Sequence, residues 1–283
     1  MTNSGGLSIA TDELIAEVDG SLPVCSQFTL DELDGWERFL APEYDPENWG
    51  QRLEMQRRND CRANGGSTCA EIVEYRSKGK KGELSRMFLY QQCELIDRKL
   101  GADSGVSMQA GVKVMTEVGL PLESEYPYTQ YTGRRDQLDR WVTPDLLASA
   151  GTRKVVKASV APAWDVAVAH VALGHPLDLA SYWPLSFESE DIGRGRTERV
   201  VRQYNGKHGG SGHAYAGSFV VRTPRGELLI KVHNSHNYFF YLSERAYEQI
   251  RDRRNNPFGV YQLAGAADPK KAYEGQFSSM GWS

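Results

Sequence analysis

The apolar pattern of this 283-residue chain changes near residue 150, and the change limits the folds open to it. Before that point apolar side chains recur at helical spacing, and after it they gather in short runs rich in Val, Ile, Tyr and Phe. A helical half followed by a β half predicts an α+β fold whose functional site lies in the cleft between the halves. We expect helices at 61–75, 84–100, 107–118 and 164–173, and strands at 154–160, 177–182, 213–222 and 227–233.

The composition suits a folded protein without a strongly charged partner. Apolar residues make up 40% of the sequence, and 33 Lys and Arg against 37 Asp and Glu leave a net charge of −4. This balance gives no electrostatic reason to expect nucleic acid or an anionic membrane as a partner. The apolar runs are short, and the first residues lack the basic and apolar regions of a secretion signal. We therefore expect no secretion signal, no membrane span, and a cytoplasmic or virion-associated protein.

Four segments are expected along the chain. The first is acidic and contains a Thr29 to Glu32 capping box, which predicts a short helix at 29–40 within a segment that wraps the core. The last contains aromatic residues that could dock on another protein. The expected segments are an N-terminal wrapping segment (1–50), a helical lobe with the nucleophile (51–150), a β lobe with the base (151–265) and a C-terminal tail (266–283).

A cysteine at the start of the first expected helix is the candidate nucleophile. The chain has four cysteines, too few for a disulfide scaffold, and they lack the spacing of a zinc site. At a helix start, the dipole and unpaired backbone N–H groups favour the thiolate of Cys61 and can receive an oxyanion. The amide of Gln56 could supply a second oxyanion donor. Cys69 is a competing thiol, and the plain alternative is that Cys61 is a small buried apolar side chain.

A histidine and an asparagine in the β half supply what a cysteine nucleophile needs. His213 begins an expected strand after a glycine-rich approach, and Asn234 follows the partner strand of the hairpin that turns at 223–226. An imidazole can take the thiol proton, and an amide oxygen that accepts the imidazole N–H fixes the ring tautomer. His233 and His236 flank Asn234, but no carboxylate joins the histidines, so we expect no metal and no cofactor.

With these residues, several stretches resemble the papain-like cysteine peptidases over residues 50–263. The stretches are Cys61-Arg62-Ala63-Asn64, 84–90, 103–107, Glu125-Tyr126-Pro127-Tyr128, Gly212-His213-Ala214 and Asn234-Ser235. The resemblance implies a left helical lobe and an antiparallel, β-barrel-like right lobe, with the active site in the cleft between them.

The resemblance also implies a role for each matching residue. Cys61 falls on the nucleophile, His213 on the base and Asn234 on the orienting amide. Gln56 falls on the oxyanion donor. Gly105 falls where the backbone of the family pairs with an extended peptide substrate.

Three residues or spacings depart from the family pattern. Gln56 stands five residues before Cys61 rather than six, so the oxyanion loop is one residue shorter. Asp60 places a negative charge beside the thiol, which disfavours the thiolate and opposes the helix dipole. His236 occupies the position of the tryptophan that shields the His–Asn hydrogen bond in the family. The roughly 60 residues before Cys61 also suggest a short N-terminal wrap rather than a large inhibitory pro-domain.

We therefore expect a cysteine peptidase that hydrolyses peptide bonds through a thioacyl intermediate, with a polypeptide as substrate. Two alternatives stay open. In one, the fold is a weakly active or inactive binding or structural module, such as a component of a phage virion. In the other, the same chemistry acts on peptidoglycan. Short chains of this kind resemble papain-like proteins of bacteria and their phages.

Overall fold

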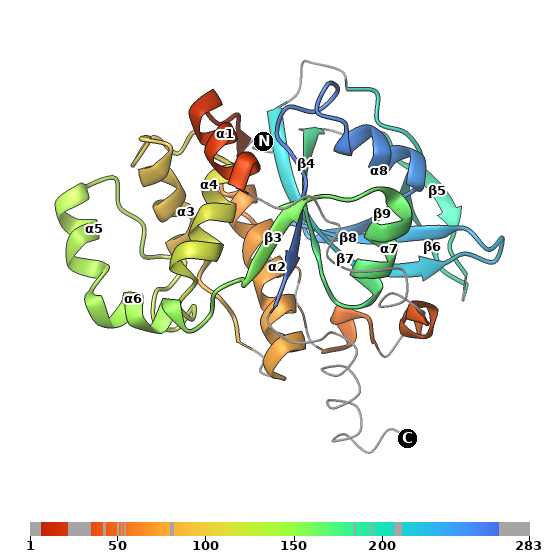
Figure 1. The fold of residues 1–283 in the computed structure, drawn as a ribbon, viewed down its shortest axis with the longest axis horizontal. Helices are drawn as coiled ribbons and strands as arrows, with labels where there is room; N and C mark the ends of the chain where they lie inside the picture. The colour runs from red at the N-terminus through yellow and green to blue at the C-terminus, as the bar shows by residue number, and fades with distance from the viewer. Residues whose placement is uncertain are drawn as a thin grey trace.

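The computed structural model describes most of the chain, and Figure 1 shows its arrangement. Cys25, His208 and the expected tail at 266–283 lie outside the described residues. The helix expected at 29–40 is described only near its end, where η1 (Trp36–Leu40) is a 3-10 helix. The described residues are 7–21, 35–41, 44–49, 51, 53, 55–79, 82–183, 185–193, 195–206 and 211–265.

Helices and a sheet lie on either side of α2 (Cys61–Lys78), which runs through the centre of the molecule (Figure 1). The helices on one side are α3 (Arg86–Ile96), α4 (Met108–Lys113) with its π-helical extension η4 (Val114–Val118), α5 (Arg135–Trp141) and α6 (Pro144–Gly151). Serine hydroxyls start two of them: Ser85 accepts a hydrogen bond from the Phe88 N–H, and Ser107 accepts one from the Ala110 N–H. These caps fix where α3 and α4 begin.

The sheet runs in the order β3-β10-β4-β7-β8-β9-β6-β5. Its neighbouring strands are antiparallel, except that β6 and β9 are parallel. Over the described residues this path is open, so the β part is a sheet rather than a closed barrel. The strands are β3 (Lys157–Val160), β4 (Leu177–Trp183), β5 (Glu188–Asp191), β6 (Thr197–Val201), β7 (Ser211–Arg222), β8 (Leu228–Asn234), β9 (Tyr238–Leu242) and β10 (Tyr261–Ala264).

The expected α+β class is confirmed, and each expected helix from residue 61 on and each expected strand is present with shifted ends. The stretch 191–212 is rich in Gly and Arg, a composition that predicts a loop outside the core; this prediction is wrong, because the stretch contains β6 with Val200 and Val201 buried. The polar start of β6 hides its strand character in the sequence. Shorter elements, among them α5, α6 and α8 (Glu244–Arg251), are too brief to give a clear periodic signal.

The two faces of the sheet form two cores. Ala180 and Ala214 face the core that includes α2 and α3. Leu179 and Tyr215, their neighbours along the strands, face the core built with α7 (Trp164–Ala172) and α8. This alternation follows from the period of two in a strand. α2 is therefore covered by the sheet on one side and by helices on the other.

α2 approaches β7 closely because small residues line its contact face. A Cβ on Gly65 would lie 3.1 Å from the backbone nitrogen of Tyr215, so only glycine fits there without a shift. The guanidinium of Arg62 forms an ion pair with Asp178 of β4 at 2.8 Å, and both side chains are fully buried. Gly66 leaves room for that guanidinium. These contacts join the first turns of α2 to the sheet.

The N-terminal segment also touches both parts of the molecule. β1 (Leu7–Ser8) pairs in parallel with β2 (Val106–Ser107), which directly precedes α4, and antiparallel with β7 at Gly212. β1 is thus a short strand between the helical part and the sheet.

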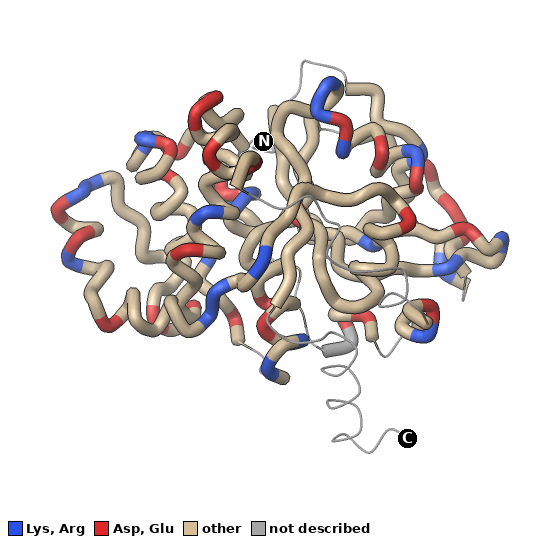
Figure 2. The backbone as a smooth tube through the Cα atoms, in the orientation of Figure 1, with Lys and Arg blue, Asp and Glu red and all other residues tan. Residues whose placement is uncertain are grey.

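α1 (Asp12–Ser21) follows β1 and is acidic, as its red segments in Figure 2 show. Its Glu17 forms an ion pair with Lys113, at the end of α4, and its Asp19 forms one with Arg253, after α8. α1 is therefore attached to both parts by opposite charges. In the part of the chain that is described, no helix has the length and apolar character needed to cross a bilayer.

Candidate active site

Cys61 is the first residue of α2, and its side chain is fully buried. The Asp60 carbonyl oxygen accepts the first helical hydrogen bond, from the Asn64 N–H at 3.0 Å. The N–H groups at the very start of α2 therefore have no acceptor within the helix. Together with the helix dipole they favour negative charge at this end. The position suits a thiolate, and an oxyanion that forms beside it.

His213 and Asn234 are hydrogen-bonded across neighbouring strands. Nε2 of His213, near the start of β7, lies 2.8 Å from Oδ1 of Asn234, the last residue of β8. The same Oδ1 accepts the backbone N–H of His236 at 3.3 Å, which orients the Asn234 amide. Because an amide oxygen only accepts, Nε2 carries the ring proton and Nδ1 carries the lone pair. The buried Nδ1 has no hydrogen-bond partner among the described residues.

Burial keeps the imidazole of His213 neutral. Desolvation is the main cause that lowers the pKa of His213 to about 3; the hydrogen bond to Asn234 opposes the shift, and the nearby His236 adds to it. A neutral imidazole with a free lone pair is the form that can accept a proton. The site is therefore prepared for a base rather than for an acid.

Two aromatic rings cover His213. Trp183, at the end of β4, packs against it with ring centroids 4.7 Å apart. The ring of His236 stacks on that of His213, with centroids 4.5 Å apart and an angle of 22° between the planes. His213 and Asn234 are both buried as a result. His236 occupies the position of the tryptophan that shields the His–Asn hydrogen bond in the family. In this chain Trp183 and His236 together cover the His213 ring.

Gln56 binds the segment that follows Asn234. The Gln56 N–H donates to the Ser235 carbonyl at 3.1 Å, and the Ser235 hydroxyl donates to Gln56 Oε1 at 2.6 Å. Its Nε2 donates to the Arg58 carbonyl at 3.3 Å. The approach to α2 is therefore bound to the end of β8. These bonds hold the residues before α2 beside the end of β8, which carries Asn234.

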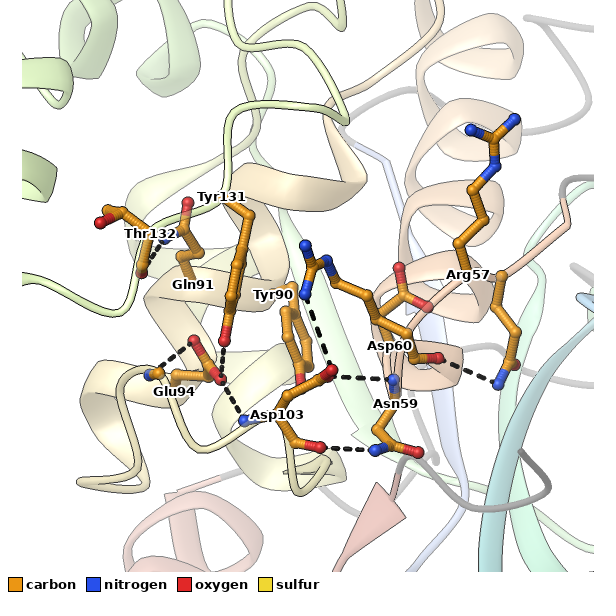
Figure 3. A network of polar contacts seen from close by, with 12 residues as sticks. Arg57, Asn59, Asp60, Tyr90, Gln91, Glu94, Asp103, Tyr131 and Thr132 are labelled. Atoms are coloured by element: carbon orange, nitrogen blue, oxygen red, sulfur yellow. Dashed lines mark hydrogen bonds and ion pairs between the residues drawn. The ribbon is translucent and has the colours of Figure 1, made fainter.

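Asp103 ties the loop before α2 to the loop before β2, as Figure 3 shows. Its Oδ1 accepts the backbone N–H of Asn59 at 3.1 Å and the Tyr90 hydroxyl at 3.0 Å. Its carbonyl oxygen accepts the side-chain amide of Asn59. We call the contacts between Asn59 and Asp103 the Asp103 clasp. Glu94 supports it by accepting the Asp103 N–H at 3.3 Å and the Tyr131 hydroxyl at 3.1 Å.

Gly105 lies between the Asp103 clasp and β2. Its φ of 81° is in the left-handed region that favours glycine. The next residue, Val106, pairs with Leu7, and Leu7 also lies opposite Gly212, the residue before His213. Leu7 is buried, and a Cβ on Gly212 would lie 3.1 Å from the Leu7 Cβ and 2.5 Å from the ring of Phe258. The N-terminal strand therefore occupies the backbone positions next to Gly105 and next to His213.

The other described thiols lie in the core. Cys69 is buried, and its Sγ donates to the Leu177 carbonyl at 3.5 Å. Burial raises the pKa of the Cys69 thiol well above its usual range, and it also raises that of Cys93. Neither is placed at a helix start. Among the residues that the structure describes, no cluster of His, Cys, Asp and Glu side chains could hold a metal ion.

No family model and no curated protein sequence matches this chain. Solved structures do. Xylellain, a cysteine protease from Xylella fastidiosa, is similar with a TM-score of 0.55 and 17% identity, over 94% of this chain and 93% of the other. A recombinant stem bromelain precursor is similar with a TM-score of 0.57 and 14% identity, over 94% of this chain and 85% of the other. Digestive procathepsin L 3 of Tenebrio molitor larval midgut is similar with a TM-score of 0.52 and 12% identity, over 92% of this chain and 83% of the other.

The chain has the papain-like fold. Within this papain-like fold, the departure at Asp60 has a structural explanation. Its Oδ2 accepts the Tyr128 hydroxyl at 2.6 Å, and the side chain is fully buried. Burial raises the pKa of Asp60 to about 6, against the effects of Tyr128 and Arg86. Below about pH 6 this carboxyl is largely protonated, so it then places less negative charge beside Cys61 than the sequence suggests.

Three residues of the candidate site are absent from the sequence-based set. Trp183 packs on His213, Asp103 ties the two loops, and Leu7 pairs beside Gly212. Trp183 directly follows the strand expected at 177–182, and Asp103 stands two residues before Gly105, so both are close to recognised features. Leu7 carries no local signal, because its partners are about 100 and 200 residues away.

Proposed function

We propose that this protein is a cysteine peptidase in which Cys61 is the nucleophile, His213 the base and Asn234 the amide that orients the base. The hydrogen bond between His213 Nε2 and Asn234 Oδ1 carries the proposal. It leaves the basic Nδ1 without another partner in the described structure, as a thiol-activating imidazole requires. The papain-like fold supports the peptidase assignment.

The register between α2 and β7 supports the pairing of Cys61 with His213. Gly65 abuts the backbone of Tyr215. Four residues later, Cys69 contacts Leu177, which lies opposite Gly217. Four helical residues rise about 6 Å and two strand residues about 6.6 Å, so helix and strand advance together. One helical turn back from Gly65 is Cys61, and two strand residues back from Tyr215 is His213.

The proposed reaction follows from these groups. Nδ1 of His213 takes the proton of Cys61, and the sulfur forms a bond to the peptide carbonyl carbon. The carbonyl oxygen becomes an oxyanion that the Cys61 N–H and the Gln56 side-chain amide bind. The C–N bond breaks as His213 returns its proton to the leaving amine. Water, deprotonated by His213, then cleaves the thioester and restores the thiol.

The proposed substrate is an extended polypeptide that pairs with the backbone beside Gly105. The position of Leu7 supports this, because it pairs with Val106, the residue after Gly105, on one side and with Gly212 on the other. The same observation means that β1 has to leave before a substrate enters. Catalysis by the full chain therefore depends on displacement of its N-terminal strand.

The test is labelling of the full chain by a peptidyl vinyl sulfone, with and without Leu7→Asp, which weakens the docking of β1. We expect one label per chain, located at Cys61 by peptide mapping and abolished by Cys61→Ala. Cys69→Ala is the matched control and should keep the label. Absence of labelling at Cys61 in both backgrounds contradicts the proposal. Casein and purified peptidoglycan as substrates then separate a peptidase from a cell-wall amidase.

A binding or structural module is the second candidate, and the buried strand at the entrance favours it. Cys61 and Leu7 are both buried, so the cleft is closed in this conformation. If Leu7→Asp opens the cleft without producing labelling or hydrolysis, this candidate is preferred.

A further inference from the structure

His236 is placed to influence the proposed base directly. Its ring stacks on that of His213 with centroids 4.5 Å apart, and Trp183 packs against both rings, at 4.7 Å from His213 and 5.4 Å from His236. His213 is fully buried, whereas His236 is only partly buried. His236 is therefore the more exposed residue of the pair, although its Nε2 is buried.

The backbone of His236 is held in place independently of its ring. Its N–H donates to Asn234 Oδ1 at 3.3 Å, and the residue forms a β-bridge with Met55. Ring substitutions at 236 leave both backbone contacts available. The effect of the ring can therefore be separated from the effect of the backbone.

Few other charges surround the His236 ring. The titratable group on β7 is His213, and that on β9 is the phenol of Tyr238, whose ring centroid is 6.5 Å away. Arg199 of β6 lies behind that phenol, 4.4 Å from its ring centroid. Trp183 of β4 and Met55, from the approach to α2, carry no charge. Nε2 of His236 has no hydrogen-bond partner among the described residues.

We propose that His236 tunes the proposed base through charge. A proton on the His236 ring opposes a further proton on the stacked His213 ring, so near neutral pH at most one of the two imidazoles is positively charged. Two positive charges at this separation in a partly desolvated site repel each other strongly. The consequence for catalysis rests on the proposed function, but the coupling itself does not.

The coupling predicts the side on which activity is lost. Burial lowers the pKa of His236 below its usual 6.5, so its ring gains a proton on the acid side of neutral. The added charge makes Nδ1 of His213 a weaker base, and transfer of the Cys61 proton slows. Activity should therefore fall with decreasing pH as His236 titrates. A neutral ring at 236 should move this fall to lower pH.

Nitrogen-15 NMR titration of the histidines in the full chain tests the coupling without an activity measurement. His236→Phe keeps a stacked ring and removes the charge, and we expect the His213 midpoint to rise by about one pH unit. His170→Phe, the same substitution in α7, is the matched control and should leave it within a few tenths of a unit. An unchanged His213 midpoint in His236→Phe overturns the proposal. So does the absence of any imidazole titration before acid unfolding in both proteins.

The pH profile of peptide hydrolysis gives a second readout that a purely structural role would not move. With Leu7→Asp in the background, His236→Phe should shift the acid midpoint of kcat/KM downward, while His236→Gln separates loss of charge from loss of stacking. An acid midpoint unchanged by both substitutions contradicts the tuning role. Failure of Cys61 labelling instead contradicts the proposed function and leaves the NMR result to decide the coupling.

Discussion

Arg62 and Asp178 form an ion pair at 2.8 Å whose two side chains are completely buried between α2 and β4. Arg62 also donates to the Met108 carbonyl through Nε and Nη2. One guanidinium thus joins α2, the sheet and the start of α4. Because Arg62 follows Cys61 directly, this pair fixes the first turn of α2 relative to β4 and its neighbour β7.

Asp178→Ala should be strongly destabilising, because it leaves the Arg62 cation buried without its partner. We expect the free energy of unfolding in urea to fall by about 3–5 kcal/mol. The double variant Arg62→Met with Asp178→Leu should recover most of that loss, since two apolar side chains replace two charges. A double variant that is no more stable than Asp178→Ala contradicts this account.

Leu7→Asp should open the candidate site. A carboxylate in the buried position of Leu7 costs about 2–3 kcal/mol of docking free energy, which corresponds to a roughly 30- to 150-fold larger open population. The rate of Cys61 labelling by a peptidyl electrophile should rise accordingly. Ile9→Asp is the control, because Ile9 is 52% exposed. Equal labelling rates in native protein and Leu7→Asp indicate that β1 does not limit access.

Asp103→Ala should lower kcat/KM of the Leu7→Asp protein by about 10- to 100-fold, because small displacements of reacting groups are costly. The clasp joins Asn59, two residues before Cys61, to the loop that leads to Gly105. We therefore expect kcat to fall and KM to rise together. Asp103→Asn should restore most activity, because asparagine keeps an acceptor and tolerates the φ of 46°. Asp136→Ala, on exposed α5, is the control.

Asp60→Asn should remove a pH dependence of stability. The pKa of Asp60 is raised to about 6 in the folded protein, above about 4 in the unfolded chain, because the side chain is buried. The raised pKa of Asp60 therefore contributes its full stabilisation to the native protein below pH 4, and this stabilisation is lost as the pH rises to about 6. Above that range Asp60→Asn should be more stable by about 1–3 kcal/mol.

Chemical unfolding at pH 4, 6 and 8 measures this effect. Asp165→Asn, an exposed position on α7, is the control and should leave the pH dependence unchanged. A native-like slope between pH 4 and 6 in Asp60→Asn would mean that another group titrates there. The same variant also tests how the charge of Asp60 affects the Cys61 thiol, because it removes that charge at all pH values.

Much of this molecule follows from local sequence. The apolar residues late in α2 and the turn at 223–226 locate α2 and the β7–β8 hairpin, because each depends on residues close in the chain. The expected contact between His213 and Asn234 is present because the hairpin brings β8 back along β7. The start of α2 at Cys61 is also predicted correctly from the sequence.

The remaining features depend on segments far apart in the sequence. Leu7 pairs with Val106 and Gly212, Trp183 reaches His213, and Asp103 reaches back to Asn59. Such contacts form only when the packing of α2 on the sheet has set the distances between those segments. The sequence alone therefore determined the order of the elements and the types of reactive side chain. Tertiary structure decided which residues cover and support the candidate site and where β1 pairs, because backbone pairing between distant segments leaves no periodic trace in either one.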